Sequence, residues 1–300
     1  MAQASFVVLE SRGILAVSGP DRLNFLQGLV SNDVEKVASD RAVYAALLTA
    51  QGKYLHDFIM AASGEAIWLD AEAARLADLK RRLAMYRLRA NVAIDELPDL
   101  AVAAVFGEGA LSALNLPEQA GTARAFGGGL AFADPRLAAL GARVVLPREQ
   151  LRDMLAKVEF AEADFAAYDR HRLALGIPDG SRDLVVEKSI LLESGFDELN
   201  GVDWQKGCYV GQELTARTKY RGLIKKRLFP VQIAGTAPAP GAIVEIEGKD
   251  AGEMRSSRDG IGLALLRLEA VDEANPLSAG STTISPLRPS WMRVDTSKDK

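Results

Sequence analysis

The sequence predicts an α+β protein whose C-terminal part is a small antiparallel β-barrel. Through about residue 225, segments typical of strands and helices alternate irregularly, without the even rhythm of a doubly wound sheet. After Arg227, short segments with alternating apolar residues are separated by turns rich in proline and glycine, which is typical of a small barrel. We therefore expect an α+β region at 1–227 and a barrel domain at 228–300.

The N-terminal half shows clear strand and helix patterns. Strands are predicted at 6–19, 42–49, 54–61, 66–70, 92–96 and 101–106. Between the fourth and fifth of these, residues 71–89 carry apolar side chains at helical spacing. Leu76, Leu79, Leu83 and Tyr86 share one face, which we expect to be buried.

The second half is predicted in the same way. Residues 121–129 are rich in glycine and are expected to form a loop, followed by a strand at 143–146. Pro147 suits the first position of a helix, and a second helix at 163–175 is ended by Gly176. Barrel strands are expected at 228–233, 242–247, 251–256 and 261–268.

The composition is that of an ordinary globular protein. Apolar residues make up 48% and charged residues 25% of the chain, which excludes a disordered or collagen-like chain. A formal net charge of -4 offers no whole-chain argument for binding nucleic acid. No apolar run approaches the ~20 residues needed to cross a bilayer, so no membrane span is expected.

The chain has a single cysteine, Cys208. It cannot form an internal disulfide, and with only His56 and His171 as histidines a Cys/His metal cage is excluded, so the chain alone holds no metal. A single thiol fits a reducing compartment, and we expect a cytoplasmic location.

The segment around Cys208, residues 200–213, is unusually polar. Lys206 precedes the thiol and would favour its thiolate form, while Gln212 and Glu213 offer an amide and a carboxylate to a ligand. From composition alone, a lone cysteine is more often a buried small apolar residue. The segment has no phosphate-binding glycine pattern and no nucleophile elbow.

The run Lys206-Gly207-Cys208-Tyr209-Val210-Gly211-Gln212-Glu213 resembles the K-G-C-[FY]-x-G-Q-E signature of the YgfZ family. Further similar segments lie at 18–34, 47–53, 172–178 and 215–222. That family is a folate-binding branch of the fold of the glycine cleavage T-protein, an aminomethyltransferase, and includes mitochondrial relatives in late iron–sulfur cluster assembly. The resemblance favours a functional role for Cys208.

The resemblance implies a T-protein-like ring of two interleaved α+β subdomains with a C-terminal barrel and a tetrahydrofolate site in the central opening. Glu193 sits where these families have a glutamate that holds the pteridine ring, although Leu191 replaces the usual proline. Cys208, Lys206 and Asp57 are the residues expected to carry chemistry. The residues expected to bind the cofactor are Glu193, Arg172, Arg12, Tyr44, Asn32, Tyr209, Gln212 and Glu213.

The chain departs from the T-protein at one informative place. The T-protein has two adjacent aspartates in its hairpin, and here the pair reads His56-Asp57. An imidazole and a carboxylate are not equivalent to two carboxylates in acid–base work, which argues against glycine cleavage. His56 itself is interpreted either as a surface strand residue or as a pocket residue.

The sequence therefore favours an assembly factor over an enzyme. It would bind tetrahydrofolate and act through Cys208 on [4Fe–4S] proteins, including radical enzymes that modify tRNA, with client proteins or assembly factors as partners. One thiolate supplies one of the four ligands that a cluster normally needs, so a transient cluster would be shared with a partner, and a redox role is equally open. The alternative is a folate-dependent one-carbon transferase that relies on Asp57.

RNA binding ranks last among the hypotheses. The run from 206 to 227 is rich in lysine and arginine and could meet phosphate, a folate polyglutamate tail or an acidic partner. It could equally be a solvated basic face, which is the commonest role of a charge run. The acidic net charge and the lack of a known RNA-binding motif argue against RNA.

Overall fold

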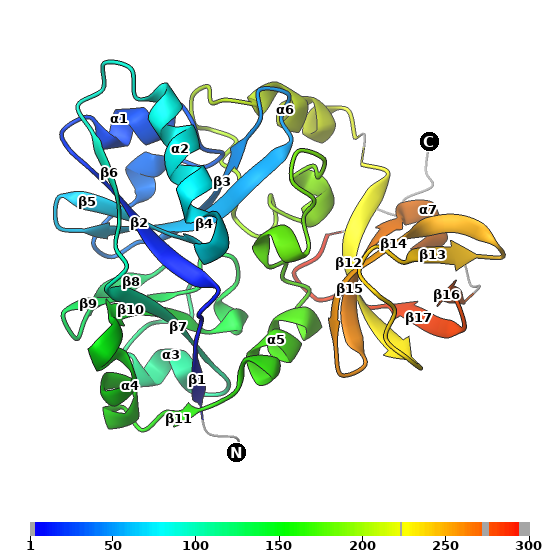
Figure 1. Cartoon of the computed structure of the whole chain (residues 1–300). Helices are drawn as coiled ribbons and strands as arrows, with labels where there is room; N and C mark the ends of the chain where they lie inside the picture. The colour runs from blue at the N-terminus through cyan, green and yellow to red at the C-terminus, as the bar shows by residue number, and fades with distance from the viewer. Residues whose placement is uncertain (1–3, 223, 272–275, 294–300) are drawn as a thin grey trace. The chain divides into compact units, whose positions relative to one another are not determined.

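The computed structural model describes residues 4–222, 224–271 and 276–293. The chain forms two compact units, and each combines segments that are distant in sequence (Figure 1). The first unit consists of Met1–Ala50, Leu55–Tyr168 and Leu199–Gln212. The second consists of Gln51–Tyr54, Asp169–Glu198 and Glu213–Lys300.

The first unit is built on two sheets. One sheet has the strand order β3-β4-β5-β2-β6, and the other has the order β11-β1-β7-β10-β9-β8. The strands of the first sheet are β2 (Arg12–Ser18), β3 (Val43–Leu48), β4 (Tyr54–Ser63), β5 (Ala66–Glu72) and β6 (Ala93–Glu96). Those of the second are β1 (Ser5–Val8), β7 (Leu100–Phe106), β8 (Ala123–Phe126), β9 (Gly129–Ala133), β10 (Ala142–Pro147) and β11 (Ala161–Glu162).

Helices cover these sheets because each carries an apolar stripe. On α2 (Leu76–Tyr86), residues Leu76, Leu79 and Leu83 are buried, and the helix packs on β2 and β6. On α4 (Arg148–Lys157), Leu151 and Leu155 join the core of the six-stranded sheet. The remaining helical segments of this part are α1 (Arg22–Gln27), η1 (Val34–Lys36), η2 (Ala73–Arg75), α3 (Ala110–Ala113) and η3 (Ala138–Leu140).

The second unit contains a closed barrel with the strand order β12-β15-β14-β13-β16-β17. Its strands are β12 (Lys226–Ala234), β13 (Ile243–Ile246), β14 (Lys249–Arg258), β15 (Ile261–Arg267), β16 (Leu277–Ala279) and β17 (Thr282–Pro286). Closure pairs β12 with both β15 and β17, so the first strand of the barrel binds the last. The helical segments in and leading to this unit are α5 (Phe165–Ala174), η4 (Gly180–Arg182), η5 (Leu192–Ser194), α6 (Gln212–Tyr220) and α7 (Leu268–Val271).

The predicted fold class is confirmed: α and β elements are mixed, and the C-terminal part is a closed antiparallel barrel. Three local predictions are wrong. The strand expected at 6–19 is divided into β1 and β2, which belong to different sheets, because a turn at residues 10–11 separates them. The expected loop at 121–129 contains β8, because its glycines form the turn of a β8–β9 hairpin instead of a long loop. Tyr86 is 42% exposed, because the buried stripe of α2 ends at Leu83. The domain boundary after residue 227 stays a prediction.

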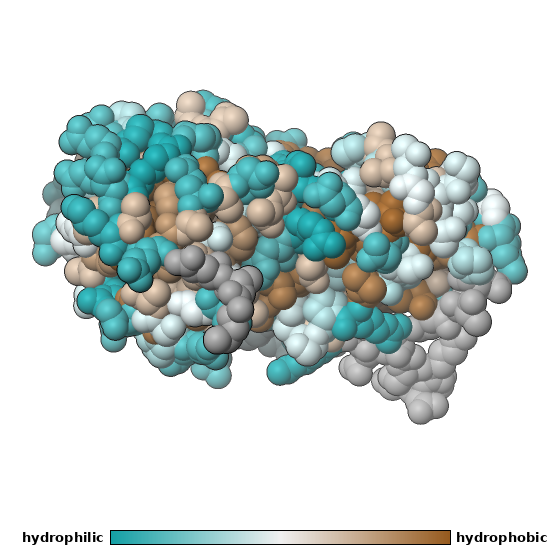
Figure 2. Space-filling model, turned by 90° about the horizontal axis from the view of Figure 1, so that it is seen from below, coloured by the Kyte–Doolittle hydropathy of each residue, from teal (hydrophilic) through white to brown (hydrophobic). Residues whose placement is uncertain are grey.

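The surface is mostly polar on the face seen from below, where hydrophilic residues surround smaller apolar areas (Figure 2). No helix among the described residues has the length and apolar character that crossing a membrane requires.

Gly129 tests how tightly the six-stranded sheet is packed. A Cβ atom there would lie 2.0 Å from the backbone oxygen of Val145 on β10, and a backbone atom in a sheet cannot move aside. We expect Gly129→Ala to lower the free energy of unfolding by about 1–3 kcal/mol, as overpacked sites do. Denaturant unfolding of the purified protein measures this.

Gly28→Ala is the matched control. Nothing lies within 4 Å of a Cβ at Gly28, and its φ of -77° suits any residue. A Gly129→Ala protein as stable as the Gly28→Ala protein would show that the β9–β10 contact is looser than described.

Candidate functional site

The signature lies in the first unit as far as Gln212, and its residues before α6 have no regular secondary structure. We call residues 206–211 the cysteine loop. The Cys208 side chain is exposed, whereas the next residue, Tyr209, is buried. The loop therefore presents its thiol to solvent while the Tyr209 side chain is buried in the protein.

Lys206 anchors the start of the cysteine loop. Its ammonium donates hydrogen bonds to three backbone oxygens, at 2.9 Å to Gln27, 2.5 Å to Val30 and 2.8 Å to Asn32. The ammonium also lies 5.0 Å from the centre of the Tyr209 ring, a cation–π distance. Burial lowers the pKa of Lys206 to about 8, although the nearby carboxylates of Asp33 and Asp203 oppose this shift.

Asp203 also holds the start of the cysteine loop, through backbone N–H groups. Its carboxylate accepts hydrogen bonds from the backbone nitrogens of Gln205 at 2.7 Å and Lys206 at 3.0 Å, and it pairs with the Lys36 ammonium. These donors keep the pKa of Asp203 below its usual range, in spite of partial burial. Asp203 was not among the residues expected in the site, although aspartate is common at the start of such a turn.

The end of the loop is also fixed. The Val210 backbone nitrogen donates to the Gly28 oxygen at 3.1 Å, and Gln212 accepts a bond from the Tyr209 nitrogen at 3.3 Å. Gly211 has a φ of +81°, a conformation that favours glycine. The loop is therefore bound to the segment after α1 at both of its ends.

Asn32 connects the signature segment to β3. Its side-chain nitrogen donates to the backbone oxygen of Tyr44 at 2.7 Å and to the backbone oxygen of Asn200 at 2.6 Å. Asn200 adopts a φ of +57°, in the left-handed region that asparagine tolerates, and its own side chain donates to the Pro135 oxygen at 3.1 Å. Two sequence-distant segments are thus joined through one buried amide.

Tyr44 and Asp57 form a buried pair on β3 and β4. The tyrosine hydroxyl donates to the Asp57 carboxylate at 2.9 Å, and the Arg136 guanidinium lies 5.5 Å from the centre of the ring. Burial raises the pKa of Tyr44 well above its usual value, and the Asp57 charge adds to this shift. The hydroxyl is therefore a neutral hydrogen-bond donor at physiological pH.

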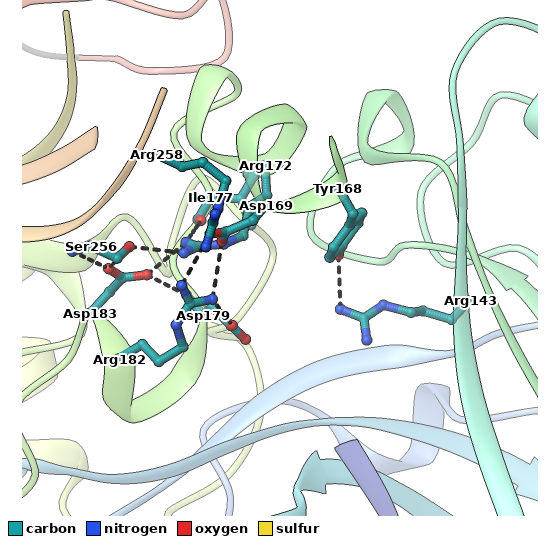
Figure 3. Close-up of polar contacts among 10 residues, drawn as sticks. All are labelled: Arg143, Tyr168, Asp169, Arg172, Ile177, Asp179, Arg182, Asp183, Ser256 and Arg258. Atoms are coloured by element: carbon teal, nitrogen blue, oxygen red, sulfur yellow. Dashed lines mark hydrogen bonds and ion pairs between the residues drawn. The ribbon is translucent and has the colours of Figure 1, made fainter. Parts of the chain in front are cut away.

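A chain of buried ion pairs extends from this pair through the first unit. Arg12 on β2 donates to the Asp70 carboxylate on β5 at 2.7 Å, and Arg143 on β10 lies 3.4 Å from the same carboxylate. Arg143 also contacts Asp134 and, as Figure 3 shows, donates to the Tyr168 hydroxyl at 3.2 Å. Arg136 completes the chain with a 2.7 Å bond to Asp134. Of these residues, sequence analysis singled out only Arg12.

His56 points to the opposite face of β4 from Asp57, because successive strand residues alternate. Its ring is buried and lies 2.9 Å from the Asp78 carboxylate on α2. Burial lowers the pKa of His56 to about 4, and the Arg75 charge acts in the same direction. The interpretation as a surface residue is wrong, since α2 covers this face.

Glu193 and Arg172 belong to the second unit. Burial raises the pKa of the half-buried Glu193 carboxyl, with Lys53 and Lys226 opposing. Within the described part of the chain, this carboxylate accepts no hydrogen bond. A half-buried carboxylate of this kind can accept hydrogen bonds from a ligand.

The Arg172 guanidinium makes four hydrogen bonds within the protein itself (Figure 3). It donates to Asp169 at 2.7 Å, to Asp183 at 2.7 Å and to the Ser256 hydroxyl at 2.8 Å. A fourth hydrogen bond, from the same nitrogen that donates to Asp183, reaches the Ile177 backbone oxygen at 3.0 Å. Arg172 therefore ties α5 and the η4 segment to barrel strand β14.

Glu213, the last of the expected site residues, is exposed on α6. The Glu213 carboxylate pairs with Arg217 one turn later on α6. Lys219 pairs with Asp197 at 3.1 Å. Part of the basic run is thus neutralised by carboxylates of the second unit.

The first unit gathers most of the expected site residues into one connected set. Asn32 links the loop to β3, where Tyr44 meets Asp57. The members of this set are Lys206, Tyr209, Gln212, Asn32, Tyr44 and Asp57, with Cys208 exposed between them. The part of the chain that the structure describes contains no group of three His, Cys, Asp or Glu residues able to hold a metal ion.

The comparisons agree with this architecture. Residues 225–294 match a family model described as the CAF17 C-terminal beta-barrel domain. The mitochondrial iron–sulfur cluster assembly factor IBA57 of Mus musculus is 36% identical over 295 residues, covering 88% of this chain and 77% of that protein. The chain belongs to the IBA57 family of iron–sulfur cluster assembly factors.

Other relatives extend the comparison. The human IBA57 protein is 35% identical over 283 residues, with the same coverage of 88% and 77%. The glycine cleavage aminomethyltransferase T of Bartonella henselae has the same fold, with a TM-score of 0.78 at 16% identity over 96% of this chain and 85% of that one. The predicted T-protein-like fold is thereby confirmed, and the predicted role in iron–sulfur cluster assembly is that of the IBA57 family.

The expected cytoplasmic location is wrong by this comparison. Both IBA57 relatives are named as mitochondrial proteins. A single reduced cysteine is compatible with either compartment, so cysteine usage could not distinguish the two.

The His56–Asp78 contact makes a testable contribution to acid sensitivity in this IBA57-family chain. The folded-state pKa of about 4 lies below the unfolded value of 6.5, so the unfolded chain takes up the proton first as pH falls. Stability is therefore lost between about pH 6.5 and pH 4, by about 3 kcal/mol at most. Urea unfolding at a series of pH values, compared between wild type and His56→Gln, isolates this part.

Glutamine keeps a hydrogen-bond donor toward Asp78 but does not titrate in this range. We expect the variant to lose less stability than the wild type over the same interval. Parallel curves for the two proteins would contradict the assignment of a buried, neutral His56.

Proposed function

We propose that this chain binds tetrahydrofolate and uses Cys208 in the assembly or repair of [4Fe–4S] proteins, including radical enzymes that modify tRNA. The observation that carries the proposal is the exposed thiol on a loop whose ends are both anchored. An exposed, positioned thiol is suited to meeting a partner, whereas a structural cysteine is buried.

The single thiol limits what the chain does alone. A [4Fe–4S] cluster normally requires four thiolate ligands, and this chain offers one. The cluster is therefore cargo shared with an iron–sulfur client protein, another assembly factor or glutathione. Cys208 supplies one ligand during transfer, and the partner supplies the others.

The folate part of the proposal depends on Glu193. A pteridine ring presents adjacent N–H donors, which a carboxylate can accept in a paired geometry. Glu193 fits this need because its carboxylate is half-buried and makes no hydrogen bond with the described residues. Arg172 fits the folate role less well, since its guanidinium is already occupied. Bound tetrahydrofolate would supply a one-carbon carrier.

Cys208→Ser tests the cluster role. Serine keeps the size of the side chain but removes the soft sulfur ligand, so we expect cluster transfer to an apo [4Fe–4S] client to slow by at least about tenfold. The measurement is recovery of the client's enzyme activity in an anaerobic assay with purified components. The exposed Gln205, replaced by alanine, is the matched control on the same segment.

Both variants should unfold within about 0.5 kcal/mol of the wild type, as is usual for surface substitutions. A Cys208→Ser protein that transfers clusters at the wild-type rate would sink the proposed role of the thiol. Loss of soluble protein would show that the thiol is structural.

Calorimetric titration with tetrahydrofolate tests the second part. We expect Glu193→Gln to weaken binding at least about tenfold, because it removes hydrogen bonds to a charged acceptor. Cys208→Ser should bind as the wild type does. No binding by the wild type would rule out the folate proposal and leave the cluster role standing.

A further inference from the structure

Lys206 lies two residues before the thiol in sequence, but its ammonium donates its hydrogen bonds to another part of the chain. All three of its N–H donors have partners, the backbone oxygens of Gln27, Val30 and Asn32 at 2.9, 2.5 and 2.8 Å. An ammonium has three donors, so these contacts satisfy it completely. The group is thus a fixed point of attachment to the turn after α1.

The three acceptors belong to one short segment of the chain. Residues 27–32 run from the last residue of α1 into the loop that leads toward β3. The Gln27 oxygen is a helix-end carbonyl, which lacks an intrahelical partner, and the Val30 and Asn32 oxygens lie in the loop itself. Lys206 donates to all three from 174 to 179 positions away in the sequence.

The second attachment of the loop lies past Cys208. The Val210 backbone nitrogen donates to the Gly28 backbone oxygen at 3.1 Å, and the buried Tyr209 ring lies 5.0 Å from the Lys206 ammonium. Gly207 lies between the lysine and the thiol with nothing within 4 Å of a Cβ, so neither packing nor a special backbone conformation holds the loop at that point. The path of the chain through Cys208 depends on its two ends.

We infer that Lys206 is a positioning residue, whose ammonium latches the cysteine loop onto the carbonyls after α1 and so determines where the Cys208 thiol is presented to a partner. This role rests on the proposed function of Cys208, because it concerns presentation of that thiol. It differs from direct activation of the thiol by a neighbouring positive charge. The latch needs a donor of ammonium size and shape, whereas activation needs only a charge near the sulfur.

Lys206→Ala tests the latch by hydrogen exchange. We expect the backbone N–H of Val210 to exchange at least about tenfold faster, the lower end of what hydrogen bonds to a charged group contribute. Alanine lacks the three methylenes and the ammonium, which together are propylammonium. Adding propylammonium should therefore slow the exchange back toward the wild-type rate.

Three controls make the result specific. Tetramethylammonium carries the charge but has no N–H donor, so it should not restore protection. Lys157→Ala removes an exposed lysine on α4 and should leave Val210 exchange unchanged. Lys206→Met keeps the unbranched stem and removes only the ammonium, so it replaces alanine if that variant fails to fold.

The outcomes separate the latch from the proposed function. Unchanged Val210 exchange in both Lys206 variants, or restoration by tetramethylammonium as well as propylammonium, would overturn the latch. Faster exchange with rescue by propylammonium alone would support it, and transfer to the client should then recover in the same samples. Hydrogen exchange needs no cluster chemistry, so it stands even if Cys208→Ser shows that the thiol has no role.

Discussion

Buried arginine–aspartate pairing is the interaction on which the rest of this structure depends. In the first unit, Asp70 on β5 receives Arg12 from its own sheet and Arg143 from the other sheet. In the second unit, Arg172 joins α5 to barrel strand β14 through Asp183 and Ser256. A buried charge that loses its partner is costly, so each pair favours the arrangement of elements that keeps its two members together.

The signature segment is held by contacts of a different kind. The Asp70 pairs connect the two sheets of the first unit, whereas the cysteine loop is attached to the segment after α1. Its anchoring uses polar atoms, with Asn32 and Lys206 on opposite sides of the attachment. Cys208 is exposed, and it carries the one sulfur atom in the sequence of the signature.

Much of this fold could be predicted from the sequence, and the exceptions have physical causes. The stripe Leu76, Leu79 and Leu83 identified α2, and the turns after Arg227 identified the barrel. The hairpin at β8 was missed because glycines mark turns inside a sheet as well as loops. The three acceptors of Lys206 were beyond sequence reasoning, because backbone carbonyls leave no trace in residue identity. Arg172 was expected in a ligand site, but its guanidinium bonds to other residues of the protein. One of these partners, Ser256, is 84 residues away, and a resemblance in sequence cannot reveal such a pairing.

The interleaving of the two units has a consequence for synthesis. The first unit needs Leu199–Gln212, although residues 169–198, which precede that segment, belong to the second unit. Domains generally fold as units as the chain emerges. The strands of both sheets in the first unit are therefore synthesised before the last segment of that unit. This last segment carries Cys208. The barrel closes later still, because β12 must wait for β17. A nascent chain stalled before residue 199 would contain every strand of both sheets and no thiol. Cys208 therefore belongs to the last segment that the first unit receives.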